Sequence, residues 1–521
     1  MIRRNRFLFL SLCLLLAIAC LPTAITPTPP SSPTSTPPHP HTSTPQHPHT
    51  PIPMLPLSPI PPLEQARALR PGFAADLDLF PDATRYELEL TVSLDALTVT
   101  GRERISYTNA EAVPLDAIYL RLFPNTPGYG GEMKVTDVLL DGRPAEPTAE
   151  LGGSVLRFSL DPPLGTGAQL ELTLSFTVAI PTRAGDGYRQ FGYYDDVLAL
   201  TNVYPLVPVY DDEGWNVELA PTYGDAVYSE TSFYSVRITA PAEMSLFASG
   251  VCSPPTFNSD GSATWTCVTG PMRDFNAILG PDYRVESNVV EGVTVNSIFY
   301  SDHREGGELA LGQATEAVRV FAHLFGPYPF TELDVVETPT YAGGIEYPGL
   351  VVINSVYYET MSEDMEWVVV HETGHQWWYS LVGNDQVDEP WLDEALVQYS
   401  TLLYYEERYG TGLAAELVDD VFRQSYEMLV ESGRDLPAGM PVAAYSSESY
   451  GPVVYRKGPL YFHELRREVG DDDFEAIVRA YFDRNRYAVA TVEDWLAAVE
   501  SVAGDEHRAL YEQWIAGPGE Q

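Results

Sequence analysis

Residues 371–375 read HETGH, and they lie within a segment of helical hydrophobic period, 367–382. On a helix, His371 and His375 stand four positions apart and project from one face, with Glu372 beside them. Two imidazoles and a neighbouring carboxylate in this spacing are typical of a zinc site whose glutamate acts as a general base. The stretch therefore predicts a zinc-binding helix at the centre of a catalytic domain.

The third metal ligand separates one class of zinc enzyme from another. A metzincin carries glycine and histidine further along the same segment, but Trp378 and Leu381 occupy those positions. Glu394 instead follows His375 after eighteen residues, inside the sequence WLDEAL at 391–396, where a second helical period begins. Two facing helices can then supply His, His and Glu, and leave a fourth position for water. We expect one zinc ion on the two histidines and Glu394; the alternative is a core histidine pair with surface acids.

These residues resemble the aminopeptidase N family of gluzincin zinc peptidases. In that family HExxH is followed after eighteen residues by W-L-N-E-G, from which this chain differs at Asp393 and Ala395. The sequence GGIEY at 343–347 resembles the G-A-M-E-N exopeptidase motif, and YRKG at 455–458 resembles Y-x-K-G. The motifs follow in the same order, and the likeness extends over nearly all of residues 70–517.

The resemblance implies roles for the residues that match. Glu372 would be the general base, and the phenol of Tyr455 would donate to the oxyanion of the tetrahedral intermediate. Glu346 would bind the free α-ammonium of the substrate, with Gly343 and Gly344 allowing close backbone approach by a ligand. For Tyr455 the alternative is an ordinary core tyrosine, and for Glu346 it is a solvated acid at a strand edge.

Two departures from the family pattern bear on the reaction. Ile345 and Tyr347 replace the Met and Asn of the exopeptidase motif, and the ring of Tyr347 could reshape or block the first subsite. No large helical domain follows the catalytic one before Gln521, as in a short bacterial form, so we expect a more open cleft. An aminopeptidase acting on peptides is expected; the alternatives are a zinc endopeptidase or oligopeptidase, and an inactive peptidase fold that only binds.

The hydrophobic patterning divides the folded part in two. Residues 70–285 show alternating apolar positions between Gly, Pro and Asp turns, which predicts an all-β sandwich or saddle. The first such run alternates at Tyr86, Leu88, Leu90 and Val92. Residues 290–521 change to helical periods with a short strand at 349–354, which predicts a mainly helical α+β domain. The resemblance makes this a thermolysin-like catalytic domain.

The N-terminal residues indicate export. In residues 1–20 three arginines precede a short apolar run, which ends in AIAC at 17–20 and resembles a bacterial lipobox. Lipid attachment at Cys20 would place the protein on the outer face of the cell membrane; simple secretion after an A-x-A box is the alternative. Residues 21–65 are rich in Pro, Thr and Ser, which predicts a disordered tether. Its histidines fit a solvated spacer better than metal capture.

Cysteine usage and charge add two expectations. Apart from two cysteines in the export signal, the chain has Cys252 and Cys267, which flank the turn-rich stretch 253–261. A disulfide across a hairpin is expected in an exported protein, with two buried thiols as the alternative. A net charge of −43 excludes nucleic acid as a natural partner, because phosphate binding needs a basic surface.

Overall fold

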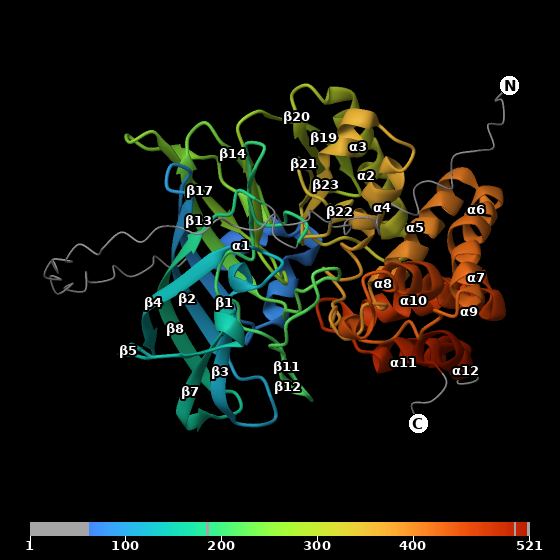
Figure 1. Ribbon diagram of the computed structural model, residues 1–521, viewed down its shortest axis with the longest axis horizontal. Helices are drawn as coiled ribbons and strands as arrows, with labels where there is room; N and C mark the ends of the chain where they lie inside the picture. The colour runs from blue at the N-terminus through green and yellow to red at the C-terminus, as the bar shows by residue number, and fades with distance from the viewer. Residues whose placement is uncertain (1–61, 184–186, 505–506, 518–521) are drawn as a thin grey trace, which may run out of the picture.

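The computed structural model describes residues 62–183, 187–504 and 507–517. Within them, a sheet-rich N-terminal domain lies beside a mainly helical C-terminal domain (Figure 1). The first domain ends with β18 (Asn276–Gly280), whereas β19 (Tyr283–Val290) already belongs to the sheet of the second. The boundary therefore lies at residues 281–282, a few residues before the expected one.

The N-terminal domain is built from strands, as the alternating pattern predicts. They are β1 (Arg85–Ser93), β2 (Thr98–Thr108), β3 (Leu115–Arg121), β4 (Glu132–Leu140), β5 (Arg143–Pro144), β6 (Thr148–Glu150), β7 (Val155–Leu164), β8 (Gln169–Ala179), β9 (Gly192–Tyr194), β10 (Val197–Thr201), β11 (Tyr210–Asp211), β12 (Gly214–Trp215), β13 (Phe233–Pro241), β14 (Ser245–Ala248), β15 (Val251–Cys252), β16 (Thr256–Phe257), β17 (Ser262–Val268) and β18. A long sheet runs β15-β17-β13-β1-β2-β8-β4-β5, with β16 on β17. Shorter sheets run β14-β18-β10-β9 and β3-β7-β6.

Strand β1 shows how the sequence pattern becomes a core. Tyr86, Leu88, Leu90 and Val92 are all buried, while the residues between them are partly or fully exposed. This strand pairs antiparallel with β2 and parallel with β13, so it lies inside the long sheet. The half-buried strand expected from the alternation is confirmed, and its inner face contributes to the core of the N-terminal domain.

The expected disulfide is present. Cys252 on β15 and Cys267 on β17 are bonded, and they are opposite each other in the strand register. The strands connect through the turn-rich residues that the cysteines flank in the sequence. The pair closes a hairpin at the edge of the long sheet.

The C-terminal domain combines a mixed sheet with many helices. The sheet runs β19-β20-β21-β23-β22, with β20 (Val293–Tyr300), β21 (Glu332–Thr338), β22 (Gly344–Ile345) and β23 (Leu350–Asn354). The helices are α2 (Arg304–Leu324), α3 (Ser355–Thr360), α4 (Met365–Gly374), α5 (Glu394–Tyr409), α6 (Thr411–Leu417), α7 (Gln424–Glu431), α8 (Tyr450–Pro452), α9 (Gly458–Val469), α10 (Asp471–Asn485), α11 (Val492–Ala503) and α12 (Arg508–Tyr511). Helix α2 packs on the sheet (Figure 1). The strand expected at 349–354 is confirmed as β23.

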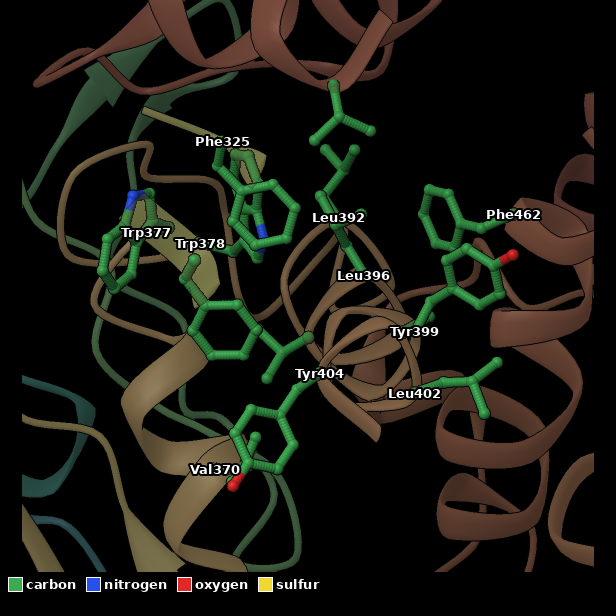
Figure 2. Packing of buried hydrophobic residues seen from close by; sticks show 14 of the residues in the cluster. Phe325, Val370, Trp377, Trp378, Leu392, Leu396, Tyr399, Leu402, Tyr404 and Phe462 are labelled. Carbon is green, nitrogen blue, oxygen red and sulfur yellow. The ribbon is translucent and has the colours of Figure 1, made fainter. Parts of the chain in front are cut away.

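Helix α5 lies at the centre of the helical core. Figure 2 shows Trp377 and Trp378 on one side of it and Phe462 on the other. On the helix, Tyr399 stacks against Phe462 with ring centroids 6.1 Å apart, and Leu396 is buried. Truncating one such buried aromatic to Ala costs about 3–5 kcal/mol. The large side chains around α5 therefore fix its position and that of its first residue, Glu394.

A segment before β1 packs against the helical domain. It comprises α1 (Pro62–Gln65) and the 3-10 turns η1 (Ala66–Ala68) and η2 (Pro71–Leu79). The described chain begins at Pro62, so residues 62–65, which the sequence assigned to the predicted tether 21–65, instead form helix α1. The reason is packing: the segment supplies Phe73, Leu77 and Phe80 to the core of the helical domain. Residues 1–61, with Cys20 and the predicted export signal, lie outside the described residues.

No helix in the described ranges is both long enough and apolar enough to cross a membrane.

Candidate active site

Helix α4 carries the first part of the predicted metal site. His371 and Glu372 lie in its last turn, and His375 is the residue at which the helix ends. The helix is therefore shorter than the expected 367–382, because the chain turns sharply after His375. The histidines still face each other, with their Nε2 atoms 3.2 Å apart.

The third predicted ligand, Glu394, is the first residue of α5 and is buried. Its Oε2 lies 3.3 Å from Nε2 of His371 and 3.5 Å from Nε2 of His375. Tetrahedral zinc with bonds near 2.0–2.1 Å places its ligand atoms about 3.3 Å apart. The three atoms thus already stand at the separations that zinc requires. The alternative of a histidine pair with surface acids is wrong, because Glu394 is not at the surface.

The charges of the site favour a cation at this point. Burial lowers the pKa of His375, but the carboxylates of Glu394, Glu346 and Glu372 outweigh it and hold that pKa well above its ordinary value. Burial alone would raise the pKa of Glu394, but the imidazoles of His375 and His371 hold it well below its ordinary value. A positive charge is therefore stabilised among these side chains, and a zinc ion supplies it in place of a proton. The donor set and the electrostatics both fit zinc.

The predicted base lies against the backbone of a strand. Glu372 is buried, and a side-chain carbon added to Gly344 would stand 2.4 Å from its Cγ. Gly344 belongs to β22, the short edge strand that carries the GGIEY motif. The absence of a side chain at Gly344 thus gives the Glu372 carboxylate the room it occupies. Gly343 precedes this strand, and its carbonyl accepts a hydrogen bond from the backbone N–H of Asn354.

Glu346 lies at the same site, buried rather than solvated. Its carboxylate, the Glu372 carboxylate and a ring nitrogen of His375 lie within 4.8 Å of one another. Its Oε1 accepts a hydrogen bond from Gln386, whose amide also donates to Asp393. Burial raises the pKa of Glu346, and the Glu394 carboxylate adds to that effect. The alternative of a solvated strand-edge acid is wrong.

Tyr347 does not fill the space beside Glu346. Its ring is buried in a cluster at the domain junction with Val197, Leu350 and Val352, and its hydroxyl hydrogen-bonds Thr201. The sequence raised the concern that this ring would reshape or block the first subsite. Because it packs into the junction, the carboxylate of Glu346 keeps its own place at the metal ligands.

Tyr455 is placed at the ligands by an irregular turn before α9. The residues 453–457 form a π-helical turn, and the Tyr455 hydroxyl donates to Oε1 of Glu394 at 2.5 Å. Its ring centroid lies 6.2 Å from that of His371. The phenol therefore stands next to two of the predicted metal ligands, as the resemblance implies.

Comparison with known proteins adds the family. Residues 309–514 match the family model of the peptidase family M1 domain. The helical domain belongs to peptidase family M1. This M1 domain contains all three predicted zinc ligands, Glu372 and Tyr455.

Relatives and solved structures extend the similarity beyond that domain. Aminopeptidase M1-A of Oryza sativa subsp. japonica is 23% identical over 474 residues, which are 87% of this chain and 52% of that protein. Aminopeptidase N of Lactococcus lactis subsp. lactis is 24% identical over 299 residues, 51% of this chain and 34% of that protein. The chain thus spans about half, or less, of the length of these curated relatives.

The fold comparison covers both domains. An M1 zinc metallopeptidase from Deinococcus radiodurans superposes with a TM-score of 0.64 at 22% identity, over 84% of this chain and 94% of that one. The shared fold therefore includes the sheet-rich domain in front of the M1 domain.

One residue at the site comes from outside the M1 domain and was missed by sequence reasoning. Asp225, in the loop between β12 and β13, hydrogen-bonds Glu394, and burial followed by the charge of Glu346 raises its pKa well above the ordinary value. Its loop is anchored by Tyr223, whose hydroxyl donates to the Tyr445 carbonyl. No motif marks Asp225 in the sequence, because its partners follow more than a hundred residues later.

Proposed function

We propose that this protein is a zinc-dependent aminopeptidase that removes residues from the N-terminus of peptides. The observation that carries the proposal is the position of Glu346, within 4.8 Å of the general-base carboxylate and of a metal-ligand nitrogen. A carboxylate there can hold the α-ammonium of a peptide through a charge-assisted hydrogen bond. The first peptide bond is then the one that reaches Glu372 and the ligands.

The side chains of the site have separate tasks. When bound, zinc supplies Lewis-acid chemistry: it makes a water molecule more acidic and polarises a carbonyl. Glu372 would act as the general base: its carboxylate would accept a proton from the attacking water and return it to the leaving amine. Gly344 leaves the room that this side chain occupies, and Gln386 keeps the Glu346 carboxylate in place by its hydrogen bond.

Tyr455 completes the set of donors. Its hydroxyl lies beside the metal ligands and donates to Glu394 in the free protein. A donor at this position can turn to an oxyanion that develops on the substrate carbonyl, where one such hydrogen bond contributes about 2.7–4 kcal/mol.

The zinc assignment is tested by metal content and by the base. Purified protein should hold one zinc ion, and chelation should abolish hydrolysis. Glu372→Gln should keep the metal and lose most of its turnover, because the proton acceptor disappears while all the ligands stay. Glu363→Gln, an exposed carboxylate just before α4, is the matched control and should stay active. Full activity in Glu372→Gln would refute the assignment.

The requirement for a free N-terminus is tested with matched peptides. The free peptide should lose one residue at a time, and the same peptide with an acetylated N-terminus should resist. Glu346→Ala should raise the activation barrier for the free peptide by about 2 kcal/mol or more. Internal cleavage of the acetylated peptide at a comparable rate would favour the zinc endopeptidase reading, with the zinc chemistry intact.

The proposal extends to location. The export signal predicted from residues 1–20, with its cysteine at position 20, supports attachment to the outer face of the cell membrane through a lipidated Cys20. Cys20→Ser should release the protein or leave it unprocessed, as fractionation of cells and medium would show. Wild-type protein found only in the medium, with Cys20 unmodified or absent, would establish simple secretion.

A further inference from the structure

Tyr379 has an unfavourable backbone conformation four residues after the ligand His375. Its φ of 112° lies in the region that residues with a side chain rarely adopt. Such a conformation costs of the order of 1–3 kcal/mol and persists only where the surroundings fix it. Here the surroundings are two consecutive residues of the N-terminal domain, Arg273 and Asp274.

These two residues bind Tyr379 at both ends. The Nε of Arg273 donates to the Tyr379 carbonyl at 2.6 Å, and the Tyr379 hydroxyl donates to Oδ2 of Asp274 at 2.8 Å. Both Arg273 and Asp274 are almost completely buried. Asp274 is itself held by a hydrogen bond from Asn276. The backbone and the ring of Tyr379 are therefore both fixed from across the domain junction.

The side chain of Arg273 is itself fixed by hydrogen bonds and by close packing. Its remaining guanidinium donors bind the carbonyls of Ser229 and Ala488. A side-chain carbon added to Gly383 would stand 2.1 Å from its Cζ, so the guanidinium lies directly against that glycine. The cation thus joins the N-terminal domain to two separate turns of the M1 domain.

The peptide group between Trp378 and Tyr379 connects this arrangement to the metal site. Its carbonyl accepts a hydrogen bond from Nδ1 of His375 at 3.1 Å, and its N–H donates to the Val382 carbonyl at 2.8 Å. Because a carbonyl can only accept, Nδ1 carries the proton and Nε2 keeps its lone pair for a metal. The φ angle of Tyr379 is the rotation between this peptide group and the rest of Tyr379, which Arg273 and Asp274 hold in place. It therefore sets the orientation of the Trp378 carbonyl.

We propose that Arg273 and Asp274 are positioning residues for the zinc ligand His375. They hold Tyr379 in its strained conformation, and the Trp378 carbonyl in turn fixes the ring orientation and the tautomer of the histidine. Hydrogen-bond partners of metal-bound histidines change metal affinity by about 10- to 100-fold when they are lost. This inference rests on the proposed zinc site. It makes the N-terminal domain a part of the metal centre.

The test is the zinc affinity of Tyr379→Phe, measured by competition with a chelator. The substitution removes only the hydroxyl that binds Asp274, and it should weaken zinc binding by about 10-fold or more. The absorption spectrum of the cobalt-substituted variant should also change, because the orientation of one ligand ring changes. Gly383→Ala, which displaces the Arg273 guanidinium, should have the same effects without touching Tyr379.

Tyr487→Phe is the matched control. Tyr487 is also buried, has a φ of 72°, and donates its hydroxyl at 2.9 Å to Asp76. Loss of this hydroxyl should lower the thermal stability of the metal-free protein as much as Tyr379→Phe does, and leave zinc affinity within about twofold, since the hydroxyl bonds to Asp76 and to no group that orients a ligand.

Each outcome decides a different point. Wild-type zinc affinity and an unchanged cobalt spectrum in Tyr379→Phe would overturn the positioning role, even if Gly383→Ala fails to fold. Equal weakening by Tyr487→Phe would also overturn it, since the effect would then be general destabilisation. A wild-type protein that binds no zinc would instead refute the proposed function.

Discussion

Tyr455 and Tyr450 are neighbours with different surroundings. Their ring centroids lie 5.8 Å apart, but the Tyr455 hydroxyl contacts a predicted ligand, whereas that of Tyr450 has no hydrogen-bond partner among the described residues. We predict that Tyr455→Phe lowers kcat by about 10²- to 10³-fold with little change in KM, because it removes a donor to the oxyanion. Tyr450→Phe should keep kcat. Zinc content, measured in both variants, should stay at the wild-type value.

Glu103 is a buried carboxyl group without a hydrogen bond. It lies on β2 between Leu88 and Leu174, is 1% exposed, and neither of its oxygens has a partner within the described part of the chain. Burial raises its pKa well above the ordinary value. A raised pKa in the folded state means that folding loses stability as pH rises from the unfolded pKa toward the folded one.

We therefore predict that Glu103→Gln changes the pH dependence of stability. Between pH 5 and the folded pKa, the free energy of unfolding of the wild type should fall, relative to the variant, by about 1.4 kcal/mol per pH unit. Urea unfolding at several pH values measures this difference. Glu146→Gln, an exposed carboxylate, is the control and should show no such slope. A constant difference between Glu103→Gln and wild type across this range would contradict the raised pKa of the buried carboxyl group.

At the scale of residues, the sequence predicted what local spacing controls. The three metal ligands were predicted from HETGH and from the eighteen residues between it and Glu394. Two of them are neighbouring positions on one helix and the third is the first residue of the next, so short-range spacing is enough to identify them. Asp225 and Arg273 could not be found in this way. They reach the site through loops of another domain, and no local pattern records a contact between residues so far apart in the chain.

The disulfide belongs to the scale of elements. It joins β15 and β17 with a sequence separation of 15, which corresponds to about 3 kcal/mol in the chain-entropy description. We predict that the double variant Cys252→Ser, Cys267→Ser loses roughly that free energy of unfolding and keeps its kcat, because neither cysteine is among the side chains of the candidate active site. Unfolding of the wild type with and without a reductant gives an independent measure. An unchanged unfolding midpoint in both experiments would contradict the prediction.

The secondary structure of an element was predicted well where one of its faces is exposed to solvent, and poorly where all of its faces are buried. Strand β1 follows its alternating pattern. Helix α4 was predicted to continue to Val382, but it ends at Gly374, and residues 375–382 are buried on all sides. A fully buried run has no polar face, so its hydrophobic period cannot distinguish a helix from a turn. The strained Tyr379 lies in that run, where its partners are contributed by the other domain.

At the scale of the molecule, the segment before β1 joins the start of the described chain to the helical domain near its end. Leu77 packs on the core of the helical domain, while Leu79, two residues later, is 61% exposed. We predict that Leu77→Ala lowers the free energy of unfolding by about 1–3 kcal/mol, and that Leu79→Ala stays within about 0.5 kcal/mol. Urea unfolding followed by tryptophan fluorescence compares the matched pair. A Leu77→Ala effect no larger than about 0.5 kcal/mol would show that the contact of Leu77 with the helical domain adds no stability.

The same segment has a consequence for the order in which the chain is completed. Asp76 accepts its hydrogen bond from Tyr487, a residue 411 positions further along. A ribosome that adds about 5–20 residues per second needs roughly 20–80 seconds to make the intervening chain. The β domain can fold during that time, but Phe73 and Phe80 lack the side chains of Arg486 and Tyr487, against which they pack, until the end of the chain emerges. The first described segment to be synthesised is therefore among the last to complete its contacts, and a growing polypeptide exposes these two aromatic rings until then.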